Sequence, residues 1–309
     1  MKPEVNGEGV PAETRCGFVA LIGAPNVGKS TLVNALVGAK VTIVSRKVQT
    51  TRALIRGILV ENNAQLVLVD TPGIFAPKRR LDRAMVLTAW TGAHDADLVC
   101  VLLDAKLGID AEADTILTTL AKVAHPKILV INKIDLVPRE KLLALAKAAN
   151  DRLKFEDTFM ISALSGDGID ELKQSLARNV PPGPFHYPED QMSVAPLRHL
   201  AAEITREKIF RQLHQELPYQ STVETDTWTD RKDGSVRIEQ TIFVERESQR
   251  KIVLGKGGAT IKSIGADARK EIAEIAGQPV HLFLFVKVRE NWGDDPDRYK
   301  EMGIEFPKE

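Results

Sequence analysis

Residues 18–31 read FVALIGAPNVGKST, and this stretch decides the fold of the first part of the chain. Its five opening residues form a short, unbroken apolar run, which is typical of a strand buried on both faces of a sheet. The residues from Gly23 to Ser30 match the pattern GxxxxGK(S/T). Glycines let such a loop approach phosphates closely, and the N-terminus of the helix expected at 29–37 attracts anions. The stretch therefore predicts a phosphate-binding loop.

The rest of the first half repeats this alternation of strand and helix. Further apolar runs occupy residues 66–69, 98–103, 128–131 and 158–161. Helical stretches are expected at 111–124 and 169–176. Buried strands alternating with helices form a mainly parallel sheet, which binds ligands at the carboxyl ends of its strands. The predicted fold class is therefore α/β, with a mainly parallel sheet.

Two loops at these strand ends supply groups for a nucleoside triphosphate and a magnesium ion. We expect Lys29 to reach the β- and γ-phosphates and the Ser30 hydroxyl to bind Mg²⁺. Asp70 follows the second run, where its carboxylate can hold Mg²⁺ through water, and the Gly73 N–H can meet the γ-phosphate. Lys29 and Gly73 are thus candidate catalytic residues. The expected nucleotide contacts of the two loops are Gly23, Ala24, Pro25, Asn26, Val27, Gly28, Lys29, Ser30, Thr31, Asp70, Thr71, Pro72, Gly73 and Ile74.

A third segment, Asn132-Lys133-Ile134-Asp135, indicates which base is bound. Guanine presents two adjacent donors that the single carboxylate of Asp135 can accept, whereas adenine would leave that carboxylate unsatisfied. Lys133 can cover the base plane, and Asn132 can tie this loop to the phosphate loop. Ser162-Ala163, after the next strand, offers a backbone N–H to the guanine carbonyl. The cofactors predicted are therefore GTP or GDP with Mg²⁺.

The second half begins after a proline-rich stretch. Four prolines between Pro181 and Pro188 favour an extended spacer and mark a domain boundary. Beyond it, the pattern predicts a small α+β domain. Its expected order is a helix at 197–213, strands at 222–228 and 236–244, helices around a glycine loop at 255–258, and a strand at 280–288.

The glycine loop Gly255-Lys256-Gly257-Gly258 resembles the GxxG loop of a type II KH domain. In KH domains this loop clamps the backbone of about four nucleotides. Residues 181–309 carry a net charge of −3, but residues 246–270 hold seven basic and two acidic residues. A local basic face suits a selective single-strand binder, and a merely solvated helix is the alternative. The RNA-binding candidates are Gly255, Lys256, Gly257, Gly258, Lys251 and Lys262.

Taken in order, these segments resemble a translation-factor-type GTPase. Two segments in particular resemble the Era family: Pro25-Asn26-Val27-Gly28-Lys29-Ser30-Thr31 and Gln49-Thr50-Thr51-Arg52. The second domain agrees with the same family, so the resemblance extends over nearly the whole chain. The resemblance implies a GTPase whose KH domain binds 16S ribosomal RNA near its 3′ end during processing and small-subunit assembly. It also implies that Thr51 is a catalytic switch residue that reaches Mg²⁺, with Thr50 as the alternative.

Ile74 departs from the usual GTPase pattern, because many GTPases place a water-orienting glutamine there. The sequence therefore predicts slow intrinsic hydrolysis. The resemblance implies that a potassium ion is held beside Asn26 and acts where other GTPases use an arginine finger. The other interpretation is that Asn26 only forms hydrogen bonds within the loop. A constitutive single-stranded RNA-binding protein with a structural nucleotide is the alternative function.

The predicted organisation is a disordered tail (1–15), an Era-type GTPase domain (16–180), a linker (181–192), a KH domain (193–290) and an acidic tail (291–309).

With 42 basic and 42 acidic residues and two cysteines, the composition excludes a polycation and a disulfide scaffold. We expect a cytoplasmic monomer. The family implies at most peripheral contact with the inner face of the cell membrane.

The sequence leaves two interpretations open for a pair of phenylalanines and for a cluster of basic residues. Phe283 and Phe285 alternate with Leu282 and Leu284, so they point to the opposite face of the strand and either pack under a neighbouring helix or domain or stack on bases. The basic residues at 78–83 either contact RNA or only keep a switch helix solvated.

Overall fold

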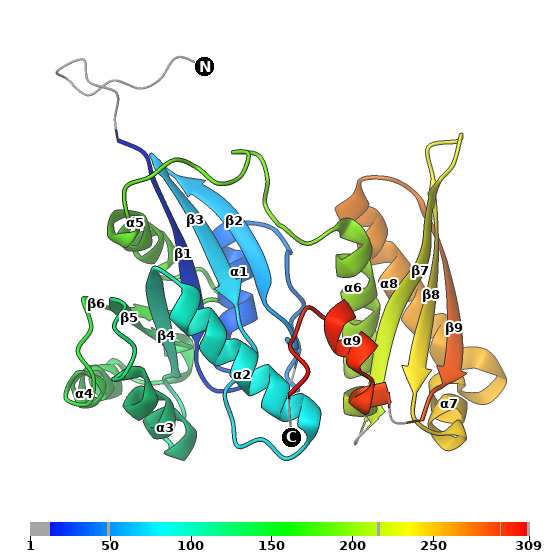
Figure 1. Cartoon of the computed structure of the whole chain (residues 1–309), viewed down its shortest axis with the longest axis horizontal. Helices are drawn as coiled ribbons and strands as arrows, with labels where there is room; N and C mark the ends of the chain where they lie inside the picture. Colours follow the sequence, from blue (N-terminus) through cyan, green and yellow to red (C-terminus); the bar gives the residue numbers. More distant parts are fainter. Residues whose placement is uncertain (1–12, 48–49, 215–216, 291, 308–309) are drawn as a thin grey trace. The chain divides into compact units, whose positions relative to one another are not determined.

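A six-stranded sheet forms the centre of the first half of the chain (Figure 1). Its spatial order is β2-β3-β1-β4-β5-β6, in which β2 runs antiparallel to β3 and every other pair is parallel. Every residue of β3, β4 and β5 is buried, as the unbroken apolar runs predict. The strands are β1 (Arg15–Ile22), β2 (Ile55–Glu61), β3 (Ala64–Asp70), β4 (Leu98–Asp104), β5 (Lys127–Asn132) and β6 (Asp157–Ile161). The predicted α/β class is confirmed.

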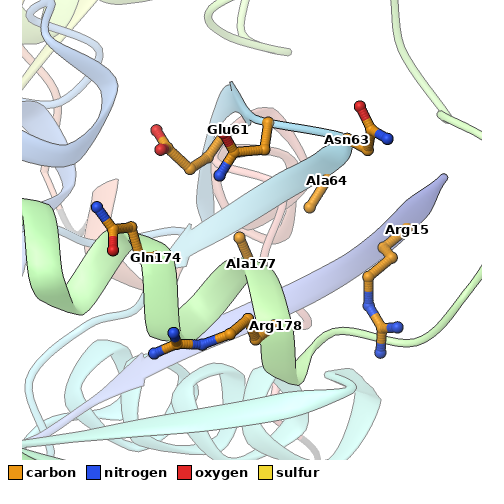
Figure 2. Close-up of a pocket in the computed structure, with 8 residues that line it drawn as sticks. Arg15, Glu61, Asn63, Ala64, Gln174, Ala177 and Arg178 are labelled. Carbon is orange, nitrogen blue, oxygen red and sulfur yellow. The ribbon is translucent and has the colours of Figure 1, made fainter. Parts of the chain in front are cut away.

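Helices flank this sheet and fill one large apolar core with it (Figure 1). They are α1 (Lys29–Val37), α2 (Arg80–Asp95), α3 (Ala111–Leu120), α4 (Arg139–Asn150) and α5 (Ile169–Asn179). Helices α1 and α5 contact each other and the β2–β3 side of the sheet. Gln174 and Arg178 of α5 line a pocket together with Glu61 of β2 (Figure 2). Gly57 of β2 allows the close approach of α1, since a Cβ there would lie 2.9 Å from Val37 Cγ2.

The computed structural model describes residues 13–47, 50–214, 217–290 and 292–307. The expected disordered tail therefore lies largely outside the described residues. The chain divides into two units, each described here by itself. The first comprises residues up to 41, 51–78 and 82–194, and the second comprises residues 42–50, 79–81 and those from 195 onward. No helix among the described residues is long and apolar enough to cross a membrane.

The proline-rich stretch, expected to be an extended spacer, packs on the first unit. The N–H of Cys16 donates to the Pro181 carbonyl, so the stretch begins beside β1. The buried Gln65 side chain accepts hydrogen bonds from the N–H groups of His186 and Tyr187 and donates to the Tyr187 carbonyl at 2.8 Å. Further on, Ile58 N–H donates to Met192 along β2. The first unit therefore extends to residue 194.

The second unit is built on a three-stranded sheet of order β7-β8-β9, with β7 antiparallel and β9 parallel to β8. Helices α6 and α8 pack together, and they contact β7 and β9 respectively. The strands are β7 (Ser221–Asp230), β8 (Val236–Val244) and β9 (Val280–Val288). The helices are α6 (Leu197–Gln212), α7 (Glu247–Leu254), α8 (Ala259–Ala276) and α9 (Pro296–Glu301). This is the smaller α+β arrangement that the sequence predicts.

The residues expected as an acidic tail are folded into the second unit. Trp292 is buried, and its indole N–H donates to the Gln220 carbonyl at 3.0 Å. Tyr299 of α9 is also buried and donates to the Gly293 carbonyl at 2.6 Å. Two buried aromatic rings anchor this segment, which a count of its acidic residues does not reveal.

Candidate nucleotide and RNA sites

The phosphate loop lies between β1 and α1, as expected, and its backbone is shaped for close contacts. Asn26 has φ 62° and Gly28 has φ 102°. A Cβ at Gly28 would lie 2.3 Å from the Asn132 amide nitrogen, so only glycine fits beside the base-recognition loop. The loop therefore presents backbone N–H groups at the N-terminus of α1, where an anion is favoured.

Lys29 is buried inside this loop. Its ammonium group donates to the carbonyls of Gly23 at 2.9 Å and Ala24 at 3.0 Å. Burial lowers the pKa of Lys29 from its ordinary 10.5 to about 8, although the Asp70 carboxylate acts in the opposite direction. The amine is thus held where phosphates would replace the carbonyls as its partners and stabilise its charged form.

Three oxygen-bearing side chains converge next to the loop. Ser30 Oγ donates to Asp70 Oδ2 at 2.7 Å, and Thr51 Oγ1 lies 2.9 Å from Ser30 Oγ and 3.1 Å from Asp70 Oδ2. Hydroxyl and carboxylate oxygens are the ligands that Mg²⁺ prefers, so the donor set fits this ion. Thr50 instead donates to the Lys47 carbonyl. Of the two candidate threonines, the geometry therefore favours Thr51.

The segment after Asp70 touches the phosphate loop. A Cβ at Gly73 would lie 2.8 Å from the Cα and N atoms of Pro25, so the backbones meet at a distance that only glycine permits. Ile74 N–H donates to the Gly23 carbonyl at 3.1 Å, and the Ile74 side chain is buried in the apolar core. Ile74 therefore supports the fold of the loop and has no polar group with which to orient a water molecule.

The base-recognition loop is joined to the phosphate loop through Asn132. Its Nδ2 donates to the Val27 carbonyl at 2.8 Å, while its Oδ1 accepts from the N–H groups of Lys133 and Ala163. Lys133 has φ 68°, and its ammonium group donates to the Asn26 carbonyl at 2.6 Å. The predicted tie between the two loops is thus present as hydrogen bonds.

Asp104 is a residue of this site that the sequence analysis missed. Its carboxylate pairs with the Lys133 ammonium group and also accepts from the N–H of Lys106 at 2.8 Å. The available signal was its place directly after the apolar run at 98–103, at the carboxyl end of β4. Asp135 is exposed and Ser162 is buried, at the ends of neighbouring strands β5 and β6.

The glycine loop of the second unit connects α7 to α8. Gly255 has φ 72°, and a Cβ there would lie 2.1 Å from Thr260 Oγ1. Gly257 (φ 61°) and Gly258 (φ 78°) have open space where a side chain would stand. Lys251, Lys256 and Lys262 are exposed around the loop. Gly255 therefore serves the turn itself, while Gly257 and Gly258 leave the loop surface bare, as close contact with a nucleic-acid backbone requires.

The structure thus keeps the two sets of candidates in separate units. The nucleotide residues come from strand ends of the first sheet, and the glycine loop belongs to the second unit. Among the residues that the structure describes, no three His, Cys, Asp or Glu side chains form a metal cluster. The magnesium expectation therefore depends on Ser30, Thr51 and Asp70. Asn26 is exposed, and no other ligand for potassium is identified.

This combination of a phosphate loop, a Ser-Thr-Asp corner and an Asn-Lys-x-Asp loop at strand ends defines a GTPase, with a KH-type unit after it. Comparison with protein families agrees. Residues 18–133 match the family model described as a 50S ribosome-binding GTPase, and residues 216–293 match that of the KH domain.

Full-length relatives identify the family. The chain is 82% identical to GTPase Era of Bradyrhizobium diazoefficiens over 309 residues, which cover 100% of both chains. It is 64% identical to GTPase Era of Brucella suis biovar 1 over 301 residues, covering 97% of each. The chain therefore belongs to the Era family of GTPases, and the expected resemblance is confirmed.

Two solved structures extend the likeness to three dimensions. A variant of Aquifex aeolicus Era bound to GDP and AlF4⁻ has a TM-score of 0.89 and 37% identity, with 94% of this chain and 99% of that chain covered. An Era complex with MgGDPNP and nucleotides 1506–1542 of 16S ribosomal RNA has a TM-score of 0.88, with the same identity and coverage. Both cover the GTPase and the KH parts.

Proposed function

We propose that this protein is a GTP-driven switch that binds 16S ribosomal RNA near its 3′ end and acts in 16S processing and small-subunit assembly. The observation that carries the proposal is the presence, in one chain, of a fully connected guanine-nucleotide site and a bare glycine loop. The Era complex with MgGDPNP and nucleotides 1506–1542 of 16S ribosomal RNA, which is 37% identical to this chain, supports it.

The residues of the first unit have distinct roles in this proposal. Ser30, Thr51 and Asp70 would hold Mg²⁺, which supplies positive charge to the phosphates when it is bound. Lys29 binds the β- and γ-phosphates, and the backbone N–H of Gly73 contacts the γ-phosphate. Asp135 accepts both guanine donors. A backbone N–H of Ser162-Ala163 would meet the guanine carbonyl, for which the Ala163 N–H would have to leave or share its present acceptor, Asn132 Oδ1. Together these groups bind GTP and orient its terminal phosphate for attack by water.

Slow intrinsic hydrolysis follows from the position of Ile74. Its side chain is buried in the core, so water must be oriented by another group. We infer that a potassium ion beside Asn26 supplies positive charge to the phosphates, where other GTPases use an arginine finger. Hydrolysis should then slow when potassium is replaced by sodium, and Asn26→Ala should lose the ion response. Equal rates in both salts for the unmodified protein would contradict the potassium role.

Binding of RNA through the glycine loop can be tested at Gly257. The position has φ 61°, which Asn and Asp tolerate better than other side chains, so both substitutions preserve the loop. Gly257→Asp adds bulk and a negative charge where the RNA backbone passes, whereas Gly257→Asn adds the same bulk without charge. We expect the Asp variant to lose more affinity for 16S 3′-end RNA than the Asn variant. GTP affinity should stay unchanged in both, and full RNA affinity in both would refute the assignment.

A constitutive RNA-binding role, with nucleotide only as a structural ligand, is the second candidate. The buried, apolar Ile74 side chain favours it, because it removes the usual water-orienting amide. Single-turnover hydrolysis of GTP, measured with and without the 16S fragment, separates the two functions. A switch predicts that RNA changes the hydrolysis rate or that GTP and GDP give different RNA affinities. Independence of the two activities would support the constitutive role.

The cytoplasmic location and the monomeric state remain predictions, as does peripheral contact with the inner face of the membrane. Flotation with vesicles of anionic phospholipids tests the membrane contact, and light scattering tests the oligomeric state.

A further inference from the structure

The sheet of the second unit has an outer face that its helices do not cover. Along β9, Leu282, Leu284 and Val286 pack against the apolar clusters of this unit. Phe283 and Phe285 point to the opposite face, where 42% and 48% of their surfaces are exposed. Because β9 is an edge strand of this sheet (Figure 1), the two rings lie near its rim. Exposed phenylalanines in adjacent outward positions mark a surface for a partner.

An arginine, a histidine and a lysine lie beside these rings. Arg237 of β8 lies over the Phe283 ring, with its guanidinium carbon 4.5 Å from the ring centroid. His281 and Lys287, the next outward positions of β9 on either side of the two rings, are exposed. Aromatic rings combined with arginine and lysine are the composition of surfaces that stack nucleic-acid bases.

The carboxylates of the same face are already engaged by neighbours. Glu239 accepts from Arg237 at 2.6 Å, and Asp226 accepts from the Thr241 hydroxyl at 2.7 Å. Glu224 is paired with Arg298. Arginines thus offset the charges of Glu239 and Glu224, whereas Asp226 keeps its negative charge on β7, the strand furthest from Phe283 and Phe285.

The chain covers only one end of this face with its own residues. Arg298 of α9 lies over the Phe243 ring, 4.6 Å from its centroid, at the far end of β8. Phe283 and Phe285 pair in register with Glu239 and Thr241, closer to the start of β8, and remain exposed. Within the described part of the second unit, about half of each ring surface is left accessible to a partner.

We propose that Phe283 and Phe285, with Arg237, form a base-stacking site for single-stranded RNA on the outer face of this sheet. The proposal builds on the proposed RNA binding at the glycine loop and is separate from it, since that loop joins α7 and α8 on the inner face. Both helices contact β9. An RNA strand leaving the loop would reach the outer face by crossing β9, one of the two edge strands of the sheet, so that the two surfaces form one continuous RNA path.

The test compares substitutions at Phe285 on RNAs of two lengths. Stacking on an aromatic side chain contributes enough that its removal should weaken binding at least about fivefold. We expect Phe285→Ala to show this loss on a 16S 3′-end RNA of about 15 nucleotides but not on one of about 5, which only the glycine loop engages. Phe285→Trp should keep full affinity, and its fluorescence should be quenched by the long RNA.

Two control variants make the result specific. Phe285→Leu keeps an apolar side chain but cannot stack, so it should lose affinity as Phe285→Ala does. Leu197→Ala removes another exposed apolar side chain of the same unit and should bind normally. Full affinity of Phe285→Ala for the long RNA would overturn the proposal, and so would wild-type affinity of Phe285→Leu, which would indicate an apolar protein partner. Failure of the proposed RNA binding at the glycine loop is distinguished by another variant. In that case Gly257→Asp would bind both the long and the short RNA with wild-type affinity.

Discussion

Replacement of Lys29 by methionine should make the empty protein more stable at neutral pH while abolishing GTP binding. The buried ammonium group donates to the Gly23 and Ala24 carbonyls, and burial lowers its pKa to about 8 from 10.5. At about 1.4 kcal/mol per pH unit, holding the charged form in the folded protein costs about 3 kcal/mol below pH 8. Methionine retains the unbranched stem and carries no charge, so this cost is absent from the variant.

The sign of the pH dependence follows from proton binding. Between pH 8 and 10.5 the unfolded chain holds the Lys29 proton more tightly than the folded protein does. The free energy of unfolding therefore rises with pH in this window. We expect the wild type to gain about 3 kcal/mol relative to Lys29→Met between pH 7 and 10.5. Groups other than Lys29 titrate in both proteins and cancel in the difference.

Urea unfolding of the nucleotide-free and magnesium-free protein measures this difference directly. Calorimetry of GTP binding in buffers of different ionisation enthalpy supplies a second measurement. Phosphates restore the charge of Lys29, so binding near pH 9 should take up close to one proton in the wild type. Parallel stability curves for the two proteins, together with no proton uptake, would refute the assignment of a buried, partly deprotonated Lys29.

Three further predictions concern single residues. Asp135→Asn should lose GTP affinity and gain affinity for xanthosine triphosphate, because the amide reverses the hydrogen-bond demand; unchanged GTP binding in a filter assay would count against the assignment. Asp104→Ala removes the partner of Lys133 and should weaken GTP binding by about 1 kcal/mol, without changing the preference for GTP over ATP. Gln65→Leu removes three buried hydrogen bonds to the proline-rich stretch and should lower the free energy of unfolding by about 2–3 kcal/mol, as measured in urea, and increase proteolysis at 181–194; resistance equal to the wild type would contradict the proposed anchoring.

Most of the first sheet was predictable because its strands are unbroken apolar runs. The exception is β2, whose sequence Ile55-Arg-Gly-Ile-Leu-Val-Glu61 is interrupted by a charge and a glycine. That strand is antiparallel and needs no fully apolar run, and Gly57 is required there for contact with α1. Helices α2 and α4 were not assigned either, since charged and apolar residues are mixed along both of them.

The residues of the nucleotide site that belong to short sequence motifs were predicted, whereas the contacts between residues far apart in the sequence were not. Motif spacing is enough to place Gly28, Lys29 and Asn132, because backbone conformation and strand ends determine where they lie. Two adjacent hydroxyls at positions 50 and 51 are equivalent in sequence, and only the fold distinguishes the one that meets Asp70. No local pattern connects Asp104 with Lys133, which lies 29 residues further along the chain.

The same distinction explains the outer face of the second sheet. Alternation along β9 determines on which side Phe283 and Phe285 lie, because successive side chains of a strand point to opposite faces. Whether that side is covered depends on where the C-terminal segment packs, and it packs at the Phe243 end through Arg298. A sequence pattern thus predicts local structure, such as the face of a strand on which a residue lies. It does not predict which distant segment packs over that face. An exposed aromatic pair becomes a candidate for function only after the fold has been shown to leave it uncovered.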